Sequence, residues 1–351
     1  MDPVRTDHAD LPSVSFIIPT YNSARTLDRC LRAIVAQDYP QHLVEILVLD
    51  GGSTDSTPDI ARGMGVPFRV EASGEQYQVN AEARMALGVA SAKGAVAAFV
   101  MSDNILPSSN WLRQMVQPFQ DDREVALTQT LHYAYRPEMA LLDRYGALMG
   151  AGDPVAYYLD KRDRMSWRED TWHAPGQVHD RGQYLEVHLR ADSLPPMGCN
   201  GALIRRDLLL KYTRYTPGEF SHSDAVLDLV LQGFNKVAIV KNDIIHENGD
   251  ALLPAVRKRL RYFRSLRPSE NRPRRYRLFD HRRRGDIWKL TVFLLYSLTI
   301  IKPTWDAVRG YIRIRDVAWF INPIFCLSMA FSYSMALMLE LLQRVQWWPS
   351  R

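Results

Sequence analysis

The chain has 351 residues, of which 46% are hydrophobic and 24% charged, and its formal net charge is +5. This length suits one folded domain of roughly 200–250 residues with an appendage. Its three cysteines, Cys30, Cys199 and Cys326, match no zinc or disulfide spacing, which excludes a disulfide scaffold and fits a reducing compartment. Residues 1–13 lack an apolar core, so no signal peptide is expected.

The positive charge is concentrated in one part of the chain. Residues up to about 250 mix both signs, whereas 257–289 carry many arginines and lysines opposed only by Glu270, Asp280 and Asp286. Such clusters bind anionic lipid headgroups. A nucleic-acid partner is not expected, because the cluster lies beside apolar segments and no nucleic-acid-binding motif accompanies it.

Short apolar runs alternate with segments of helical periodicity through the first 250 residues, which predicts an α/β fold with a mostly parallel sheet. The first strand is the apolar run 14–18. After it, the pattern predicts a helix over 24–36, a strand over 44–50, a short helix opening at Thr57-Pro58, a strand over 67–71, a helix over 76–93, a strand over 95–101, a helix over 111–119 capped by Asn110, and a strand over 125–130. The stretch 134–195 shows no regular period, and regular signals resume at 198–204 with a helix over 222–233 and a strand over 237–240.

Three polar motifs follow three of these predicted strands. They are Pro19-Thr20-Tyr21-Asn22, Asp50-Gly51-Gly52-Ser53 and Ser102-Asp103-Asn104. In an open parallel sheet, ligands bind beyond the carboxyl ends of the strands. We therefore expect the three motifs to meet at one edge of the sheet and to share a site.

Each acid in these motifs has a structural and a functional interpretation. Asp50 could accept hydrogen bonds from a nucleotide base or ribose, or simply form a turn. Asp103 could bind a divalent cation on a diphosphate or form an ordinary Asp-Asn turn. His246, which ends another predicted strand, could be a second ligand or a structural residue. Asp224 begins a predicted helix, where an acid favours the helix dipole and could also act as a general base.

Taken together, the motifs resemble family 2 glycosyltransferases of the GT-A fold over residues of about 13–250. The resemblance rests on the three motifs and on Gly198-Cys199-Asn200-Gly201-Ala202 followed by two arginines. It implies an inverting transferase that uses a nucleotide-diphosphate sugar, with a family-level bias to UDP or GDP.

The resemblance also assigns roles to individual residues. It implies that Pro19, Tyr21 and Asp50 bind the nucleotide, and that Asp224 is the catalytic base. It further implies that Asp103, the last acid of the family's Asp-x-Asp triplet, binds a divalent metal (Mg2+ or Mn2+), with His246 completing the site. Two positions depart from the family pattern: Met101 replaces the first acid of the triplet, and Ser223 replaces the acid that usually precedes the base.

The C-terminal part contains two apolar segments, 287–301 and 317–342, with Trp319, Trp347 and Trp348 near the ends of the second. A membrane span needs about 20 apolar residues, which only the second segment supplies. The alternative is a helical hairpin buried against the rest of the protein. The sequence thus predicts a catalytic domain over 1–250, a basic amphipathic juxtamembrane segment over 251–286 and hydrophobic membrane-associated helices over 287–351.

The sequence therefore predicts a glycosyltransferase on the cytoplasmic face of the inner membrane, with membrane lipids and a lipid-linked or glycan acceptor as partners. Two alternatives stay open. The acceptor could be a polyprenyl phosphate, or the chain could be a degenerate family member that binds a nucleotide or glycan without turnover, as Met101 would allow. A dinucleotide-dependent dehydrogenase is disfavoured, because no Gly-x-Gly-x-x-Gly follows the first strand.

Overall fold

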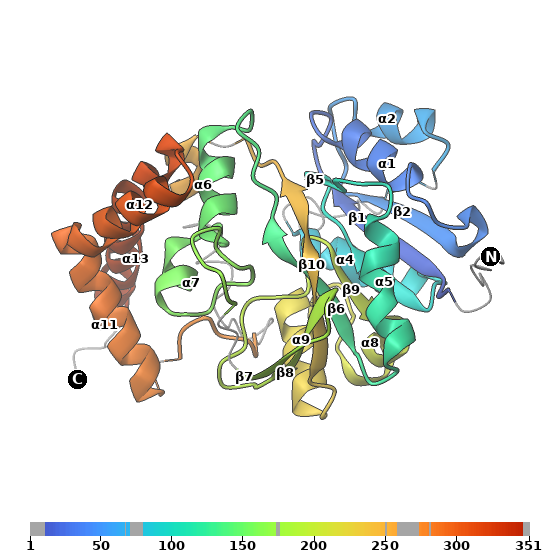
Figure 1. Ribbon diagram of the computed structural model, residues 1–351. Helices are drawn as coiled ribbons and strands as arrows, with labels where there is room; N and C mark the ends of the chain where they lie inside the picture. Colours follow the sequence, from blue (N-terminus) through green and yellow to red (C-terminus); the bar gives the residue numbers. More distant parts are fainter. Residues whose placement is uncertain are drawn as a thin grey trace. The chain divides into compact units, whose positions relative to one another are not determined.

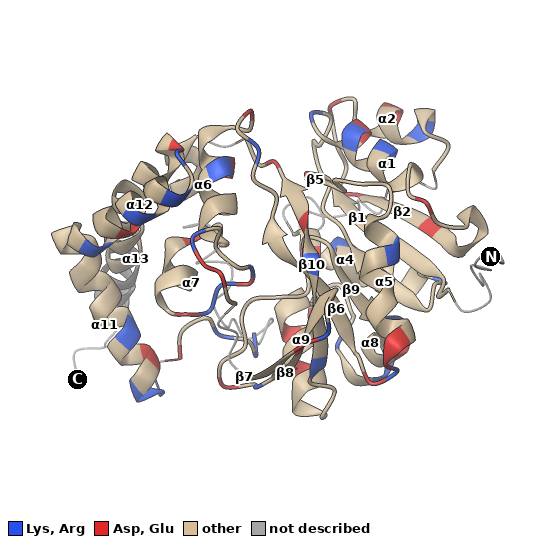
Figure 2. Cartoon of the chain, viewed as in Figure 1, with Lys and Arg blue, Asp and Glu red and all other residues tan. Residues whose placement is uncertain are grey.

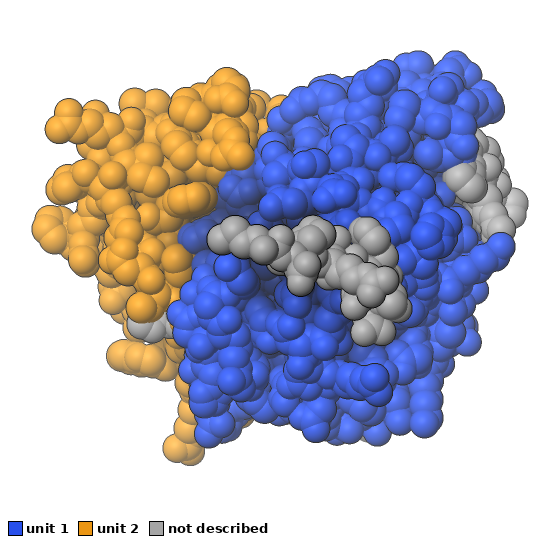
Figure 3. All heavy atoms as spheres, turned by 45° about the vertical axis from the view of Figure 1, so that its right-hand side comes forward, with its two compact units in different colours: residues 1–134, 173–247, 274–276 blue, residues 135–172, 248–273, 277–351 orange. Residues whose placement is uncertain are grey.

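The computed structural model describes residues 11–66, 68–70, 80–172, 176–249, 251–257, 274–280 and 282–346. The chain forms two compact units, shown in different colours in Figure 3. Unit 1 comprises 1–134, 173–247 and 274–276, and unit 2 comprises 135–172, 248–273 and 277–351.

Unit 1 is built on one mixed sheet in the order β3-β2-β1-β4-β9-β6-β10-β8-β7 (Figure 1). The strands are β1 (Val14–Thr20), β2 (Val44–Asp50), β3 (Phe68–Val70), β4 (Val96–Phe99), β6 (Leu127–Tyr133), β7 (Gly176–Asp180), β8 (Tyr184–Leu189), β9 (Ala202–Arg205) and β10 (Lys236–His246), and the short β5 (Asn104–Ile105) pairs with β10. Only β9 and β8 run against their neighbours along the main path. This arrangement confirms the expected α/β class and mostly parallel sheet.

Strands β1 and β4 form where the sequence is continuously apolar, because both faces of the sheet are covered there, whereas every residue of β7 is exposed. All seven residues of β1 and all four of β4 are buried. Helix α4 (Ala81–Ser91) packs directly on the sheet at Gly88, where a Cβ would lie 2.3 Å from Ile17 Cγ2 and 2.8 Å from Leu49 Cδ1. The absence of a side chain at Gly88 therefore sets the helix-to-sheet distance beside the carboxyl ends of β1 and β2.

The remaining helices of unit 1 are α1 (Leu27–Val35), α2 (Thr57–Gly63), α5 (Trp111–Asp121), α8 (Arg206–Tyr212) and α9 (His222–Leu231), with a short 3-10 turn at Gln41–Leu43. Every expected element of this unit is present within a few residues, although 67, 71 and 76–79 lie outside the described residues. One detail differs. Asn110 precedes α5 but makes no side-chain cap bond, since its Oδ1 accepts from Ser108 Oγ at 2.7 Å instead.

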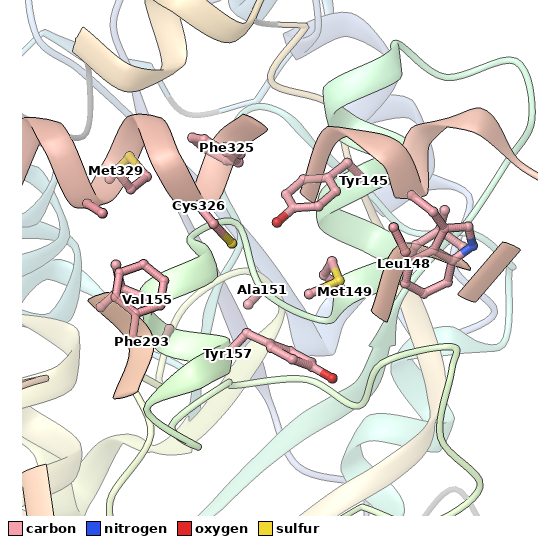
Figure 4. Packing of buried hydrophobic residues seen from close by; sticks show 14 of the residues in the cluster. Tyr145, Leu148, Met149, Ala151, Val155, Tyr157, Phe293, Phe325, Cys326 and Met329 are labelled. Carbon is pink, nitrogen blue, oxygen red and sulfur yellow. The ribbon is translucent and has the colours of Figure 1, made fainter. Parts of the chain in front are cut away.

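Unit 2 is helical. It contains α6 (Leu141–Met149), α7 (Pro154–Tyr158), α11 (Arg284–Thr299), α12 (Ile301–Arg313), a 3-10 turn at Val317–Phe320 and α13 (Ile321–Gln346). Figure 4 shows Phe325, Cys326 and Met329 of α13 among side chains of α6 and α7, and the Phe325 ring contacts Tyr145 edge-on at a centroid distance of 5.6 Å. The irregular stretch 134–195 thus contributes two short helices to this core and the β7–β8 hairpin to unit 1.

The two C-terminal apolar segments form α11 and α13, and the residues between them form α12. A left-handed residue, Ile300 at φ 52°, separates α11 from α12, so the first apolar segment ends in a break. Val317–Met335 has the length and the mean hydropathy, 1.3, of a membrane span, and 39% of that window is buried inside unit 2. Its buried face includes Asn322, whose Oδ1 accepts from Tyr145 Oη at 2.9 Å, whereas Ile324, Leu327 and Phe331 on the other face are exposed. Trp347 and Trp348 lie outside the described residues.

Candidate active site

The loops that follow β1 and β2 are joined to one another by hydrogen bonds. Register pairs Thr20 with Asp50, and beyond this pair the Asn22 backbone N–H donates to Ser53 Oγ at 2.7 Å. In return, Asn22 Oδ1 accepts from the Thr54 N–H at 2.9 Å. These bonds hold Pro19, which is buried, and Tyr21, which is 39% exposed, beside the turn that Asp50 begins.

Asp50 is buried and holds this turn. Its Oδ2 accepts from the backbone N–H groups of Gly52 and Ser53 at 2.9 and 2.7 Å, and its Oδ1 accepts from Thr20 Oγ1 at 3.1 Å and from Ser53 Oγ at 2.5 Å. Gly52 has φ 86°, a left-handed conformation that glycine adopts without strain. Asp50 thus forms the turn that the sequence allowed for, and its hydrogen bonds fix the backbone of Gly52 and Ser53 at the end of β2.

A buried cation lies near these loops, and the sequence patterns did not single it out. Arg84 on α4 is 4% exposed, and burial lowers the pKa of its guanidinium to about 10, although Asp50 and Tyr21 act in the opposite direction. Buried arginines are rare unless they are paired or functional. The sequence signal was an arginine within the apolar, alanine-rich run of 81–91. A charged residue in a helix is ordinarily exposed, so sequence alone did not indicate that Arg84 is buried.

The third motif joins the same edge of the sheet. Ser102 Oγ donates to Ser23 Oγ at 2.9 Å, and the Met101 N–H donates to Asn104 Oδ1 at 2.9 Å, which closes the turn. The Glu247 N–H then donates to the Asp103 carbonyl at 2.9 Å. The expectation that the three motifs meet at one edge is therefore confirmed, and the end of β10 joins them.

Asp103 and His246 lie side by side because β5 pairs with β10. That pairing sets His246 opposite Asn104, and it brings His246 Nε2 to 3.6 Å from Asp103 Oδ2. Both side chains are about a quarter exposed, and the imidazole stacks on Tyr133 at a centroid distance of 5.5 Å. Within the described part of the chain, no group of three or more His, Cys, Asp or Glu side chains could hold a metal. A cation here would have these two protein ligands and would need others from a substrate.

The segment after residue 197 fits tightly against helix α9. Gly198 has φ +99°, and a Cβ there would lie 2.8 Å from Val226 Cγ2 and 3.0 Å from the His222 carbonyl oxygen. Its N–H donates to the side chain of Gln129 on β6 at 3.1 Å. The glycine therefore allows the first turn of α9, which carries Asp224, to pack against the sheet.

Asp224 is 1% exposed and its two oxygens have different environments. Oδ1 accepts from the backbone N–H groups of Arg275 and Tyr276 at 3.1 and 2.6 Å. Oδ2 is buried and has no hydrogen-bond partner among the described residues. A buried carboxylate oxygen without a partner is costly, and such sites are commonly completed by a substrate or water. This oxygen can therefore accept a proton from a bound hydroxyl.

Two other acids near Asp224 are engaged differently. Asp228, one helical turn later, forms an ion pair with Arg275 at 2.6 Å. Burial raises the pKa of the Asp228 carboxyl, Arg275 opposes that effect and the charge of Asp224 adds to it. Glu219 is exposed, and its carboxylate accepts from Thr216 Oγ1 at 2.8 Å. Of the three acids, Asp224 has the buried oxygen that lacks a hydrogen-bond partner in the part of the chain that the structure describes.

Comparisons with known proteins agree with this arrangement of motifs. The model of the family described as glycosyl transferase family 2 matches residues 15–213. A protein named glycosyltransferase AglE from Haloferax volcanii is 38% identical over 107 residues, which cover 30% of this chain and 35% of that protein. A Methanococcus voltae protein is 45% identical over 49 residues, 14% of this chain and 15% of that protein, and is named dolichyl N-acetyl-alpha-D-glucosaminyl phosphate 3-beta-D-2,3-diacetamido-2,3-dideoxy-beta-D-glucuronosyltransferase.

The matched region thus spans about a third or less of the length of these two relatives. Among solved structures, the mannosyltransferase PcManGT from Pyrobaculum calidifontis, in complex with GDP-Man and Mn2+, is 17% identical, covers 92% of this chain and 87% of its own, and has a TM-score of 0.46.

Proposed function

The chain belongs to glycosyl transferase family 2, and from this premise we propose that it transfers a sugar from a nucleotide-diphosphate sugar to an acceptor hydroxyl with inversion. The observation that carries the proposal is the joined edge of the sheet, where the loops after β1, β2 and β4 are linked by hydrogen bonds. Ligands of α/β sheets bind at that edge. Pro19, Tyr21 and Asp50 would line the nucleotide pocket. The buried Arg84 lies close enough to Asp50 and Tyr21 for them to affect its pKa.

Asp224 would act as the general base. The acceptor hydroxyl donates its proton to Oδ2 while its oxygen attacks the anomeric carbon, and the bond from that carbon to the diphosphate breaks. The negative charge leaves on the nucleoside diphosphate, and no covalent intermediate forms. The buried Oδ2, for which the described residues supply no hydrogen-bond partner, supports this role, because a positioned carboxylate within hydrogen-bond reach can take the proton.

Asp103 and His246 would hold a divalent cation, Mg2+ or Mn2+. Their side chains converge at 3.6 Å, and a carboxylate with an imidazole is an acceptable donor set, with phosphate oxygens completing the shell. When bound, the cation would stabilise charge on the departing diphosphate. The replacement of the first triplet acid by Met101 leaves that position without an oxygen ligand, which is the feature a non-catalytic family member would share.

We also place the enzyme on the cytoplasmic face of the inner membrane, with a lipid-linked or polysaccharide acceptor. Most of the large apolar side chains that unit 2 leaves exposed lie on α11, α12 and α13. Figure 2 shows charge in the first two turns of α11 and none along the rest of that helix, residues 290–299. The name of the Methanococcus voltae relative, which includes a dolichyl phosphate, supports a lipid-linked acceptor of the polyprenyl type.

The deciding experiment is a screen of UDP- and GDP-linked sugars that follows nucleotide release in the presence of membranes. Asp224→Asn keeps the size of the side chain and removes its basicity, so transfer should fall roughly 10²–10⁴-fold while donor binding persists. Near wild-type transfer by this variant would place the base at another acid, such as Asp228 or Glu219. Absence of release from every donor, with intact nucleotide binding, would favour the non-catalytic alternative.

A further inference from the structure

A short segment far along the chain from the sheet motifs contacts the proposed base. Residues Arg274, Arg275 and Tyr276, hereafter the strap, belong to unit 1 although the residues that follow them belong to unit 2. Both backbone N–H groups that reach Asp224 Oδ1 come from the strap. The Tyr276 hydroxyl donates to the Leu194 carbonyl at 3.1 Å, and the Arg275 guanidinium pairs with Asp228 on the same face of α9.

The strap is anchored by a buried acid on another helix. Glu82 of α4 is 6% exposed and receives two hydrogen bonds from the Arg274 guanidinium, one of them at 3.2 Å. The same carboxylate accepts from Ser221 Oγ at 2.8 Å and lies 3.1 Å from His222 Nδ1. Glu82 therefore binds both the strap and the start of the helix that carries Asp224. Burial raises the pKa of the Glu82 carboxyl, but His222 and Arg274 outweigh that effect and lower it to about 2.

We propose that the strap is a positioning element for the general base, and that Glu82 holds it in place through Arg274. The inference rests on the proposed function, because it takes Asp224 as the base. Two backbone donors fix Oδ1 in one orientation, and Oδ2, which has no hydrogen-bond partner among the described residues, is the oxygen left for the acceptor hydroxyl. Glu82 and Arg274 are positioning residues, since they act through Asp224.

A carboxylate that acts as a general base must be held in one orientation relative to the reacting hydroxyl. A free carboxylate rotates, and a displacement of about 1 Å at a reacting group can cost 100-fold in rate. Hydrogen bonds to one oxygen remove that freedom and leave the other oxygen to react. Asp224 is buried, and the strap provides those donors from main-chain groups that no side-chain substitution removes.

The test uses the full-length protein with the sugar nucleotide that gives the fastest release in the donor screen. Arg274→Met removes the charge and keeps much of the side-chain volume, and we expect kcat to fall about 10- to 100-fold while the donor KM changes less than about twofold. Arg274→Lys should recover part of the loss. Glu82→Gln should also lower kcat. If the Glu82→Gln protein does not fold, the Arg274→Met protein still provides the test. Arg190→Met, which breaks an exposed pair with Asp192, is the matched control and should leave kcat unchanged.

The double variant separates positioning from a general loss of structure. Residues that act as a unit are not additive, so Arg274→Met should cost nothing further when Asp224 is already asparagine. An additive loss, an unchanged kcat, or a donor KM that rises alone would overturn the role of the strap, and so would a gain in rate, which would make the strap an inhibitory cover. If Asp224→Asn itself transfers sugar normally, the assignment of the base fails instead.

Discussion

Gly198→Ala is the substitution that most directly tests how the fold presents the base. The new methyl group would lie 2.8 Å from Val226 Cγ2 and 3.0 Å from the His222 carbonyl oxygen, whereas ordinary contacts are 3.4–4 Å. The Val226 side chain can rotate away, but the carbonyl belongs to the first turn of α9. That turn must therefore move by a few tenths of an ångström, and Asp224 moves with it.

Two effects should follow, and they are measured separately. A displacement of about 1 Å at a reacting group costs about 100-fold, so a shift of a few tenths of an ångström should lower kcat for sugar transfer roughly 3- to 10-fold. Alanine at φ +99° adds backbone strain of about 1–3 kcal/mol, which should lower the melting temperature. Nucleotide affinity, measured by calorimetry with UDP and GDP, should change little, because the nucleotide loops belong to β1 and β2.

Gly218→Ala is the matched control. It lies a few residues before the same helix, no atom comes within 4 Å of its added Cβ, and its φ is not left-handed. It should leave both the melting temperature and kcat at wild-type values. If Gly198→Ala also retains both, the close approach of Gly198 to α9 does not control the position of Asp224, and the reasoning fails.

Three further predictions concern other parts of the molecule. Asp103→Ala should lower transfer by orders of magnitude without loss of fold, as should a chelator acting on the wild type; full activity in excess chelator would refute metal-assisted departure. The free energy of unfolding should decrease as the pH falls from about 4.5 toward 2, because the pKa of Glu82 is lower in the folded chain than in the unfolded one. Glu82→Gln should make that decrease smaller by about 3 kcal/mol. If chemical denaturation at a series of pH values shows the same dependence of the unfolding free energy on pH in both proteins, the prediction is wrong. The full chain should pellet with membranes after lysis without detergent, and replacing exposed Trp305 and Leu298 by serine should release part of it; a wild type found wholly in the supernatant would rule out membrane attachment.

Much of unit 1 followed from local pattern. The apolar runs that became β1, β2 and β4 are buried on both faces, so their sequence carried a strong signal. The three polar motifs could be placed at one edge because parallel strands end together. The sequence offered Asp103 and His246 as candidate ligands of one cation, and the family resemblance supported the pairing. The physical cause, antiparallel pairing of a two-residue strand with the end of β10, has no local signature.

Other features depended on contacts between distant residues. Arg84 and Glu82 look like exposed charges of an ordinary helix, and only the packing of α4 buries them and gives each its surroundings. The helices α6 and α7 are too short to show a period, and they exist because α13 covers them. The strap lies within the basic stretch 257–289, whose sequence predicted lipid contact, and its three residues instead meet helix α9 and Glu82. Sequence alone thus determined the family, the strands and the identity of the chemical groups, because these depend on neighbours along the chain. The environment of each buried charge was decided by tertiary structure, because burial and pairing bring together residues separated by up to about two hundred positions.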